Sequence, residues 1–527
     1  MAVAEERRLS AGGSVLLLTG MGAVSHVLGF FYRVALSRMV GAEVMGLYQL
    51  VMPVFSVVLS CTAVGLTAAV SNLTARRLAL EDRRGADQVL RTCLWWMLGL
   101  LLPVGAALIW WSDGVSVWLL GDARTQLGLI LLVPCAAFTG VENLHKHAFY
   151  GAGTVGAPAA VELLEQVVRA AAVLGLLVLF LPQYPERVVG LIVAGMVICE
   201  VFSSCALVLL YHRRRRRQRL TGEGLPRRQR RCQIFAVALP VGTTALLGNL
   251  MGALNAGLIP QKLVEGGMER RAAVAEFGVV CGMTLPMLAL PTVFLGAVGL
   301  VITPRLARWA ALGQWEQARA GIGRALTGVS LLVLPAMGLM AVLGGELGAL
   351  LFQQQGVGTY LLPLAGVMTL GCYQSTFAAV LSGVGRQGTV AWISIFCDVV
   401  QLAGTAWLVP QMGMGGYVAS SAAAGVLGLL LCTAMVVRVT KLRMQFFQWV
   451  AAPGLSALLM TLTCRLLMNW MRDSGVSALC SVLCVAGFGV ALYLSALSAQ
   501  GVSLAVLLPG RPSRGAAAGR GPGGCRG

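Results

Sequence analysis

The chain contains a long series of apolar segments that each have the length to cross a lipid bilayer. Fourteen of them approach or exceed the roughly 20 residues that a spanning helix needs: 14–34, 46–70, 90–111, 127–149, 160–181, 188–210, 233–259, 279–303, 325–343, 360–384, 389–410, 415–437, 448–470 and 475–497. Hydrophobic residues make up 57% of the 527 residues and charged residues only 12%, a composition that excludes soluble, fibrous and disordered proteins. The sequence therefore predicts an all-α polytopic membrane protein with about 14 transmembrane helices.

The basic residues are distributed unevenly between the two sides of the membrane. When the loops are assigned alternately to two sides, the side that includes both termini holds 30 Lys and Arg residues and the other side holds 9. Loops rich in Lys and Arg stay in the cytoplasm. We therefore predict a multi-pass membrane protein with both termini in the cytoplasm. No small-residue cleavage site follows the first apolar run, so we expect a span there rather than a signal peptide.

The densest basic run, residues 213–231, lies between two predicted spans. Alone it would suggest a nucleic-acid patch, but its position favours a loop that fixes the topology and contacts anionic lipid headgroups. We therefore expect membrane lipids, and no nucleic acid, among the partners. The tail over 509–527 is rich in Gly, Pro and Arg and is expected to be disordered.

Two short motifs recur at nearly the same spacing. The sequence AVGL at 63–66 returns at 297–300, 234 residues later, and YGAG at 150–153 resembles SGVG at 382–385, 232 residues later. Both pairs join a span to the sixth span after it, which predicts a parallel repeat about an axis along the membrane normal. The predicted units are a six-helix bundle (1–211), a basic linker (212–232), a second six-helix bundle (233–440), two extra helices (441–508) and the tail. Two bundles with a cleft between them suit alternating access.

The motifs of common enzymes are missing. None of the three lysines follows a glycine, so there is no Walker A motif, and neither H-E-x-x-H nor G-x-S-x-G occurs. Glu142, His145 and His147 resemble a set of metal ligands, but their place at the end of a span favours interfacial side chains. The fourteen cysteines form no C-x-x-C pair and are expected to act as small hydrophobes. We expect no catalytic residue, no cofactor and no metal site.

Polar side chains inside spans are costly, so they tend to face a partner or a water-filled cavity. Glu165 and Arg169 are four residues apart and share a helix face. They form either a self-neutralised structural pair or part of a cleft in which Arg169 meets an anionic substrate group. Arg33 either snorkels at the end of its span or offers a bidentate fork to phosphate. The candidate cleft residues are His26, Arg33, Gln49, Glu165, Arg169, Asn255, Gln374 and Asp398, beside the further polar residues Glu162, Glu200 and Asn249.

Four segments resemble a known family. They are VLGFFYRVALSRMVGAEVMGLYQL at 27–50, ELLEQVVRA at 162–170, NAGLIPQKL at 255–263 and TLPMLALPTVFLGAVGLVITPRLA at 284–307. Together they resemble the stage V sporulation protein B family of the multidrug/oligosaccharidyl-lipid/polysaccharide exporter superfamily, which includes the MurJ-type lipid II flippases. The resemblance implies a protein of the bacterial cytoplasmic membrane with two bundles that face each side of the membrane in turn. It also implies that Arg33 lies in a central cavity. His26 stands where the MurJ-type pattern often has an arginine, which speaks against lipid II specifically.

Three functions of different classes follow from these observations. The first is a monomeric flippase for undecaprenyl-diphosphate-linked saccharides or peptidoglycan precursors in cell-wall or spore-cortex synthesis, with the coupling ion left open. The alternative is a cation-coupled multidrug antiporter of the same fold, which usually needs a carboxylate in span 1 or span 7. Span 1 and residues 233–259 contain no Asp or Glu. The third is a membrane scaffold for a sporulation complex, which has no evident need for charges inside the membrane.

Overall fold

The computed structural model describes residues 11–217, 221–354, 356–442, 445 and 447–500. Among them, almost every residue is helical and no β-strand occurs, which confirms the predicted all-α class. The tail over 509–527, predicted to be disordered, lies outside the described residues.

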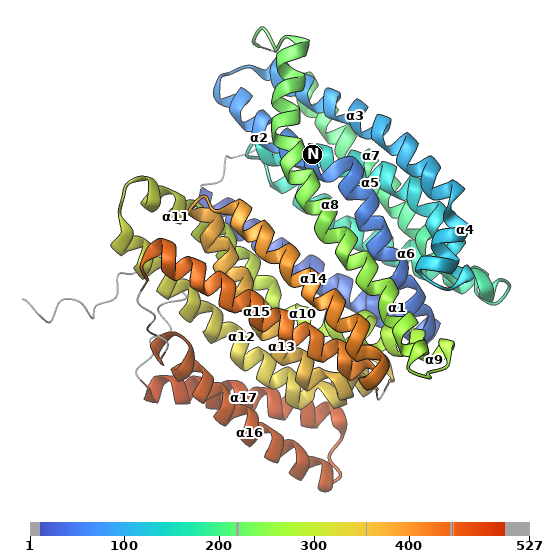
Figure 1. Ribbon diagram of the computed structural model, residues 1–527, viewed down its shortest axis with the longest axis vertical. Coiled ribbons are helices and arrows are strands. Elements are labelled where there is room, and N and C mark those ends of the chain that lie inside the picture. Colours follow the sequence, from blue (N-terminus) through green and yellow to red (C-terminus); the bar gives the residue numbers. More distant parts are fainter. Residues whose placement is uncertain (1–10, 218–220, 355, 443–444, 446, 501–527) are drawn as a thin grey trace, which may run out of the picture.

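The long helices form two bundles that lie side by side (Figure 1). The N-terminal bundle contains α1 (Ala11–Leu59), α2 (Gly65–Ala79), α3 (Arg83–Trp110), α5 (Gln126–Gly151), α6 (Gly156–Phe180) and α7 (Val188–Arg217), with the one-turn α4 (Ser112–Gly114). The C-terminal bundle contains α9 (Arg270–Phe277), α10 (Leu285–Ala289), α11 (Val293–Ala311), α12 (Trp315–Phe352), α13 (Gly356–Gly383), α14 (Gln387–Met412) and α15 (Met414–Thr440). The long helix α8 (Arg227–Glu265) lies between the two bundles. The extra helices α16 (Ala452–Asp473) and α17 (Ala478–Ala499) pack on α12 at the outer edge.

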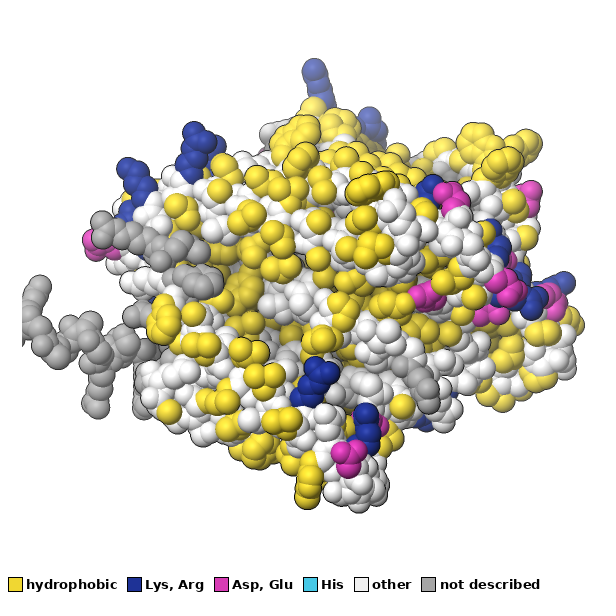
Figure 2. Space-filling model, turned by 60° about the horizontal axis from the view of Figure 1, so that its bottom comes forward, with side chains coloured by type: hydrophobic (Ala, Val, Ile, Leu, Met, Phe, Trp, Pro, Cys, Tyr) yellow, Lys and Arg dark blue, Asp and Glu magenta, His cyan; other side chains and the backbone are white. Residues whose placement is uncertain are grey.

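Thirteen helices within the described residues are long and apolar enough to cross a membrane. The first runs from Gly20 to Ala79, and its 60 residues are too long for one crossing. It breaks at Gly41, whose φ of 76° and ψ of 177° are non-helical and favour glycine. The two arms supply two spans, in agreement with the predicted segments. Figure 2 shows a face of the molecule with many exposed hydrophobic side chains; charged side chains lie along its top and right side, and a few lie in its lower middle.

The predicted repeat is visible in how equivalent helices pack. A methyl group on Gly151 of α5 would lie 2.6 Å from the backbone oxygen of Ser71 on α2. One on Gly383 of α13 would lie 2.9 Å from the backbone oxygen of Thr303 on α11. Gly383 follows Gly151, and Thr303 follows Ser71, by the same 232 residues. Each bundle therefore uses a glycine at the same position for the same close helix crossing, which confirms the parallel pseudo-repeat.

The two ends of the molecule differ in charge. We call the end where α7 finishes and α8 begins the basic end, because it carries the arginines of 213–217 and 227–231, and the opposite one the distal end. Much of the predicted basic linker is helical and is bound to α3. Arg215 forms an ion pair with Asp87 at 3.1 Å, and Arg230 donates to Gln88 Oε1 at 2.9 Å.

The two bundles are in close contact where α1 meets α9 and the π-helical turn that follows it, Gly278–Thr284. A methyl group on Gly46 would lie 2.1 Å from the backbone oxygen of Val274, and one on Gly278 would lie 2.1 Å from that of Ala42. The helix α8 packs along both α2 and α14 and so contacts both bundles. The structure therefore joins the bundles through α1 and α8.

Candidate functional site

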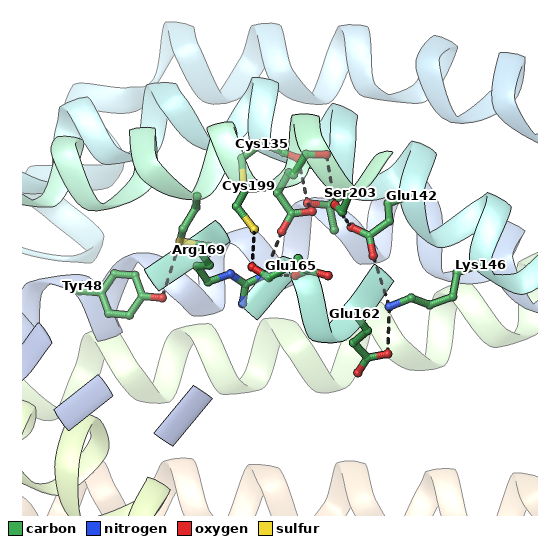
Figure 3. A network of polar contacts seen from close by, with 12 residues as sticks. Tyr48, Cys135, Glu142, Lys146, Glu162, Glu165, Arg169, Cys199 and Ser203 are labelled. Carbon is green, nitrogen blue, oxygen red and sulfur yellow. Dashed lines mark hydrogen bonds and ion pairs between the residues drawn. The ribbon is translucent and has the colours of Figure 1, made fainter. Parts of the chain in front are cut away.

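The predicted pair of Glu165 and Arg169 on α6 is part of a larger cluster (Figure 3). Arg169 Nη2 donates to Glu165 and also to Glu200 Oε1, at 3.2 Å, on α7. Glu165 is 6% exposed and Glu200 4% exposed, so both carboxylates lie in the interior of the bundle. The two carboxylates share one guanidinium group, and the predicted pair is therefore a triad.

Hydroxyl groups extend the cluster from α7 to α5. Thr139 Oγ1 on α5 donates to Glu200 Oε2 at 2.7 Å. Ser203 Oγ on α7 donates to Glu142 Oε2 on α5 at 2.6 Å. These bonds satisfy carboxylate oxygens that burial would otherwise leave without donors, and they fix α5 and α7 relative to each other.

Lys146 on α5 completes the arrangement. Its Nζ lies 3.3 Å from Glu142 Oε1 and 3.4 Å from Glu162 Oε2 on α6. Glu142 and His145 are each 3% exposed. They are buried rather than at the membrane interface, where the sequence places them, because α2, α3 and α7 pack on α5. We call the connected set the glutamate network; its charged members are Glu142, Lys146, Glu162, Glu165, Arg169 and Glu200.

Part of the network has the donor atoms of a metal site. One ligand atom each of Glu165, Cys199 and Glu200 lies within 4.8 Å of the others. The Arg169 guanidinium bonds to both carboxylates, and Cys199 Sγ donates to the backbone oxygen of Glu165 at 3.4 Å. Arg169 therefore supplies the positive charge between the carboxylates.

The structure places Arg33 of α1 near the network. Both Arg33 and Arg169 interact electrostatically with Tyr32 and Tyr48 on α1. Tyr48 donates to Met196 Sδ at 3.6 Å, whereas the Tyr32 hydroxyl is buried without a hydrogen-bond partner in the described structure. Arg33 is half-buried and forms no ion pair or hydrogen bond with the described residues. Both predicted cations therefore act electrostatically on the same pair of tyrosines, and of the two only Arg169 has a carboxylate partner among the described residues.

The predicted neutral residues divide into two groups. Asn249 Nδ2 donates to Ser60 Oγ at 2.6 Å and so links α8 to the second span, as expected of a helix–helix contact. Gln49 lies beside Gly282, and its buried Nε2 has no partner among the described residues; nor has the buried Oδ1 of Asn255. Gln49 and Asn255 therefore have unused hydrogen-bonding capacity in the interior.

Three predicted residues make no contact with the network in the described part of the chain. His26 is exposed on α1. Gln374 packs over Gly428 on α15, where a methyl group would lie 2.4 Å from Gln374 Nε2. Asp398 is half-buried on α14. Among the described residues, none of the three forms a hydrogen bond or an ion pair with Arg33 or Arg169.

An apolar cavity of about 570 Å³ lies between the second span, α3 and α8. Its wall includes the close crossing of Gly65 on α2 with Ala238 on α8 and the indole rings of α3. Its shape and lining are suited to a hydrocarbon chain. Its lining residues include Cys61, Gly65, Trp95, Trp96, Gly99 and Ala238.

Sequence comparison connects these features to known proteins. Residues 11–309 match the family described as polysaccharide biosynthesis protein. The chain is 23% identical over 427 residues to stage V sporulation protein B of Bacillus subtilis (strain 168), covering 79% of this chain and 81% of that protein. It is 20% identical over 397 residues to sporulation protein YkvU of the same organism, covering 74% and 86%.

Structural comparison gives the fold. The lipid II flippase MurJ in an inward closed conformation superposes with a TM-score of 0.68 at 11% identity, covering 92% of this chain and 98% of that one. An inward-facing multidrug resistance MATE family transporter of the MOP superfamily superposes with a TM-score of 0.63 at 17% identity, covering 81% and 99%. With more than half of its length matched by the family model, this chain belongs to the polysaccharide biosynthesis protein family and has the fold of MOP superfamily transporters.

Proposed function

We propose that the protein is a flippase that moves lipid-linked saccharides with a diphosphate linkage across the cytoplasmic membrane. The observation that carries the proposal is Arg33, a half-buried guanidinium group inside a membrane bundle that lacks a carboxylate partner among the described residues. An unpaired cation is costly in a span, and an anionic ligand would offset that cost. Its neighbour Arg169 offers a second guanidinium group.

The chemistry of the substrate fits this arrangement. A saccharide diphosphate cannot cross hydrocarbon unaided, because its charges lose their hydration. Planar guanidinium groups bind phosphate oxygens in a bidentate geometry and so replace that hydration. The apolar cavity between α2, α3 and α8 supports a lipid-linked rather than a free saccharide, because it offers a hydrocarbon surface within the membrane region.

The position of Arg33 supports a transport role. Its helix α1 packs on α6 and α7 of its own bundle, on α8 between the bundles, and on α9 and α11 of the other bundle. A side chain on such a helix changes its surroundings whenever the bundles move relative to each other. Alternating access through this movement would carry the headgroup past the membrane while the prenyl chain stays in lipid.

Proteoliposomes containing a fluorescent undecaprenyl-diphosphate-linked saccharide test the proposal. Headgroups that cross the membrane become accessible to an impermeant quencher, so the quenched fraction reports flipping. We expect flipping by the wild type and a loss of about tenfold or more in Arg33→Lys, because lysine keeps the charge but loses the planar fork. Arg465→Lys on α16 is the matched control, since Arg465 is exposed and lies outside both bundles.

The same vesicles distinguish the antiporter. A cationic dye loaded into them should not be exported under a sodium or proton gradient. Flipping at wild-type rate by Arg33→Ala at normal abundance would contradict the proposed site, and dye export without flipping would replace the proposed function.

A further inference from the structure

The glutamate network contains more negative than positive groups. Its four carboxylates, Glu142, Glu162, Glu165 and Glu200, share two cations, Lys146 and Arg169. With every group ionised the network therefore carries a net charge of −2. Three of the four carboxylates are almost completely buried. Like charges this close in a low-dielectric interior oppose each other's ionisation, so the network has a physical reason to accept a proton.

Two buried donors, one in the network and one beside it, point to an anionic ligand. The Tyr32 hydroxyl and Arg169 Nε are both buried, and neither has a hydrogen-bond partner among the described residues. Tyr32 is 8% exposed and interacts electrostatically with Arg169, Arg33 and Cys199. Arg169 Nε can only donate and the Tyr32 hydroxyl can donate, so a ligand that satisfies both groups is an acceptor. A phosphate oxygen between Arg33, Tyr32 and Arg169 would meet that need.

Such a ligand would compete with the carboxylates for Arg169. The guanidinium already bonds to Glu165 and Glu200. A diphosphate that takes over part of these contacts places more negative charge beside carboxylates that are losing their counter-ion. Uptake of one proton by a carboxylate removes that repulsion, and Thr139 and Cys199 remain as local hydrogen-bonding groups.

We propose that the glutamate network binds one proton when a diphosphate binds Arg169, so that substrate recognition is linked to proton uptake; this inference rests on the proposed function. The step makes and breaks no other covalent bond. A proton from solvent adds to an oxygen of Glu200 or Glu165, and Arg169 exchanges a carboxylate oxygen for a phosphate oxygen. The groups that surround these carboxylates are Cys135, Glu142 and Lys146 on α5, Glu162 and Arg169 on α6, Cys199 on α7, and Tyr32, Arg33 and Tyr48 on α1.

Calorimetry on the full-length protein in detergent measures the linkage directly. Geranylgeranyl diphosphate serves as the probe, and titrations in buffers of different ionisation enthalpy count the protons taken up per ligand bound. We expect about one proton per diphosphate, and a Kd that rises by up to about tenfold per pH unit where the proton must be supplied on binding. In Glu200→Gln and Glu165→Gln the count should fall, and the Kd should depend less on pH. Two variants are used so that a folding defect in one does not decide the result.

Matched measurements separate the network from the ligand. The diphosphate also titrates, so the proton counts are compared at a pH above its last pKa, where the free ligand is fully ionised and carries no proton to release. Glu276→Gln is the control, since Glu276 accepts a hydrogen bond from Tyr360 in the other bundle and should behave like the wild type. Diphosphate binding with the same proton count in wild type, Glu165→Gln and Glu200→Gln overturns this inference and leaves the proposed function intact. Absence of diphosphate binding by the wild type at every pH overturns both.

Discussion

Gly46 of the first repeat packs against Gly278, which is the equivalent residue of the second repeat. The two are 232 residues apart in sequence, the same offset that relates Gly151 to Gly383. A methyl group on Gly278 would lie 2.6 Å from the backbone nitrogen of Gly46. The neighbours are also equivalent, because Ala42 precedes Gly46 and Val274 precedes Gly278 by four residues. The contact is therefore symmetric, and it lies where the pseudo-two-fold axis passes between the bundles.

Gly46→Ala and Gly278→Ala should each weaken the contact between the bundles. The added methyl group meets a backbone oxygen that cannot turn aside, and overpacking of this kind costs about 1–3 kcal/mol. Because both substitutions push the same two segments apart, the double variant should lose less stability than the sum of the single ones. Thermal unfolding in detergent measures the effect. Gly99→Ala is the control, since nothing lies within 4 Å of its added methyl group. Equal losses of stability in the three single variants would contradict the prediction.

Arg38 should hold the bundles together beside this contact. Its Nε donates to the backbone oxygen of Leu351 at 2.6 Å, and its Nη2 donates to that of Leu350. These carbonyl groups belong to the last turn of α12, whose unpaired carbonyls and dipole favour a cation. Removal of the guanidinium group in Arg38→Ala should therefore favour conformations in which the two bundles are further apart at the end of α12.

Spin labels at Glu186 and Gln353, both exposed, report that separation. We expect a longer or broader distance distribution in Arg38→Ala than in the wild type. Arg465→Ala, an exposed arginine on α16, should leave it unchanged. An identical distribution in Arg38→Ala would show that the bond does not keep the bundles closed.

The basic end should face the cytoplasm. We expect a cysteine at Glu223, in the exposed turn between α7 and α8, to react with an impermeant maleimide only after cells are permeabilised. A cysteine at Glu186, in the connection between α6 and α7 at the distal end, should react on intact cells. The parent protein needs Cys205, Cys232, Cys480 and Cys484 replaced by serine, because they are exposed. The reverse pattern of labelling would invert the proposed orientation.

A carboxylate cluster at the distal end should make stability depend on acid pH. Arg124 bonds to Asp122 at 2.8 Å and to Glu43, just after the break at Gly41, at 2.6 Å. Burial alone would raise the pKa of Asp122, but the hydrogen bonds from the Arg124 side chain and backbone outweigh it and lower that pKa. The resulting stabilisation is fully present above the ordinary aspartate pKa of about 3.9. It is lost as pH falls through the lowered value of the folded state.

The melting temperature should therefore fall between neutral pH and roughly pH 3 by more in the wild type than in Asp122→Asn, which has no carboxyl group to protonate there. Asp473→Asn is the control, because Asp473 is exposed at the end of α16. Parallel pH profiles for wild type and Asp122→Asn would exclude this contribution.

The spans and the repeat could be predicted because each depends on a local pattern. Hydropathy locates the helices, and the glycines at 151 and 383 mark the same crossing in both halves. The pair of Glu165 and Arg169 followed from a spacing of four residues. The contact of Glu200 with Arg169 could not be predicted in this way. The two residues are 31 positions apart, and their contact depends on how α6 and α7 pack against each other.

Glu142 and His145 show a second limit of local reasoning. Their place near the end of an apolar run suggested the membrane interface, but α5 continues to Gly151 beneath neighbouring helices. Tyr32 and Tyr48 belong to the same motif as Arg33, but the motif does not indicate that their side chains are buried. Burial and unsatisfied hydroxyl groups are properties of the packed bundle and leave no periodic signal in one sequence.

The placement of the buried charges also has a consequence for synthesis. Glu142 with Lys146 on α5, and Glu165 with Arg169 on α6, bring their counter-ions within the same helix. Glu200 finds no cation in the apolar part of α7, because its partner Arg169 belongs to the preceding helix. Inserting such a carboxylate alone costs about 2.5–3.5 kcal/mol on the translocon scale. Because the connection over 181–187 is short, we expect α6 and α7 to leave the translocon as one hairpin, in which Arg169 neutralises Glu200 before the glutamate meets lipid.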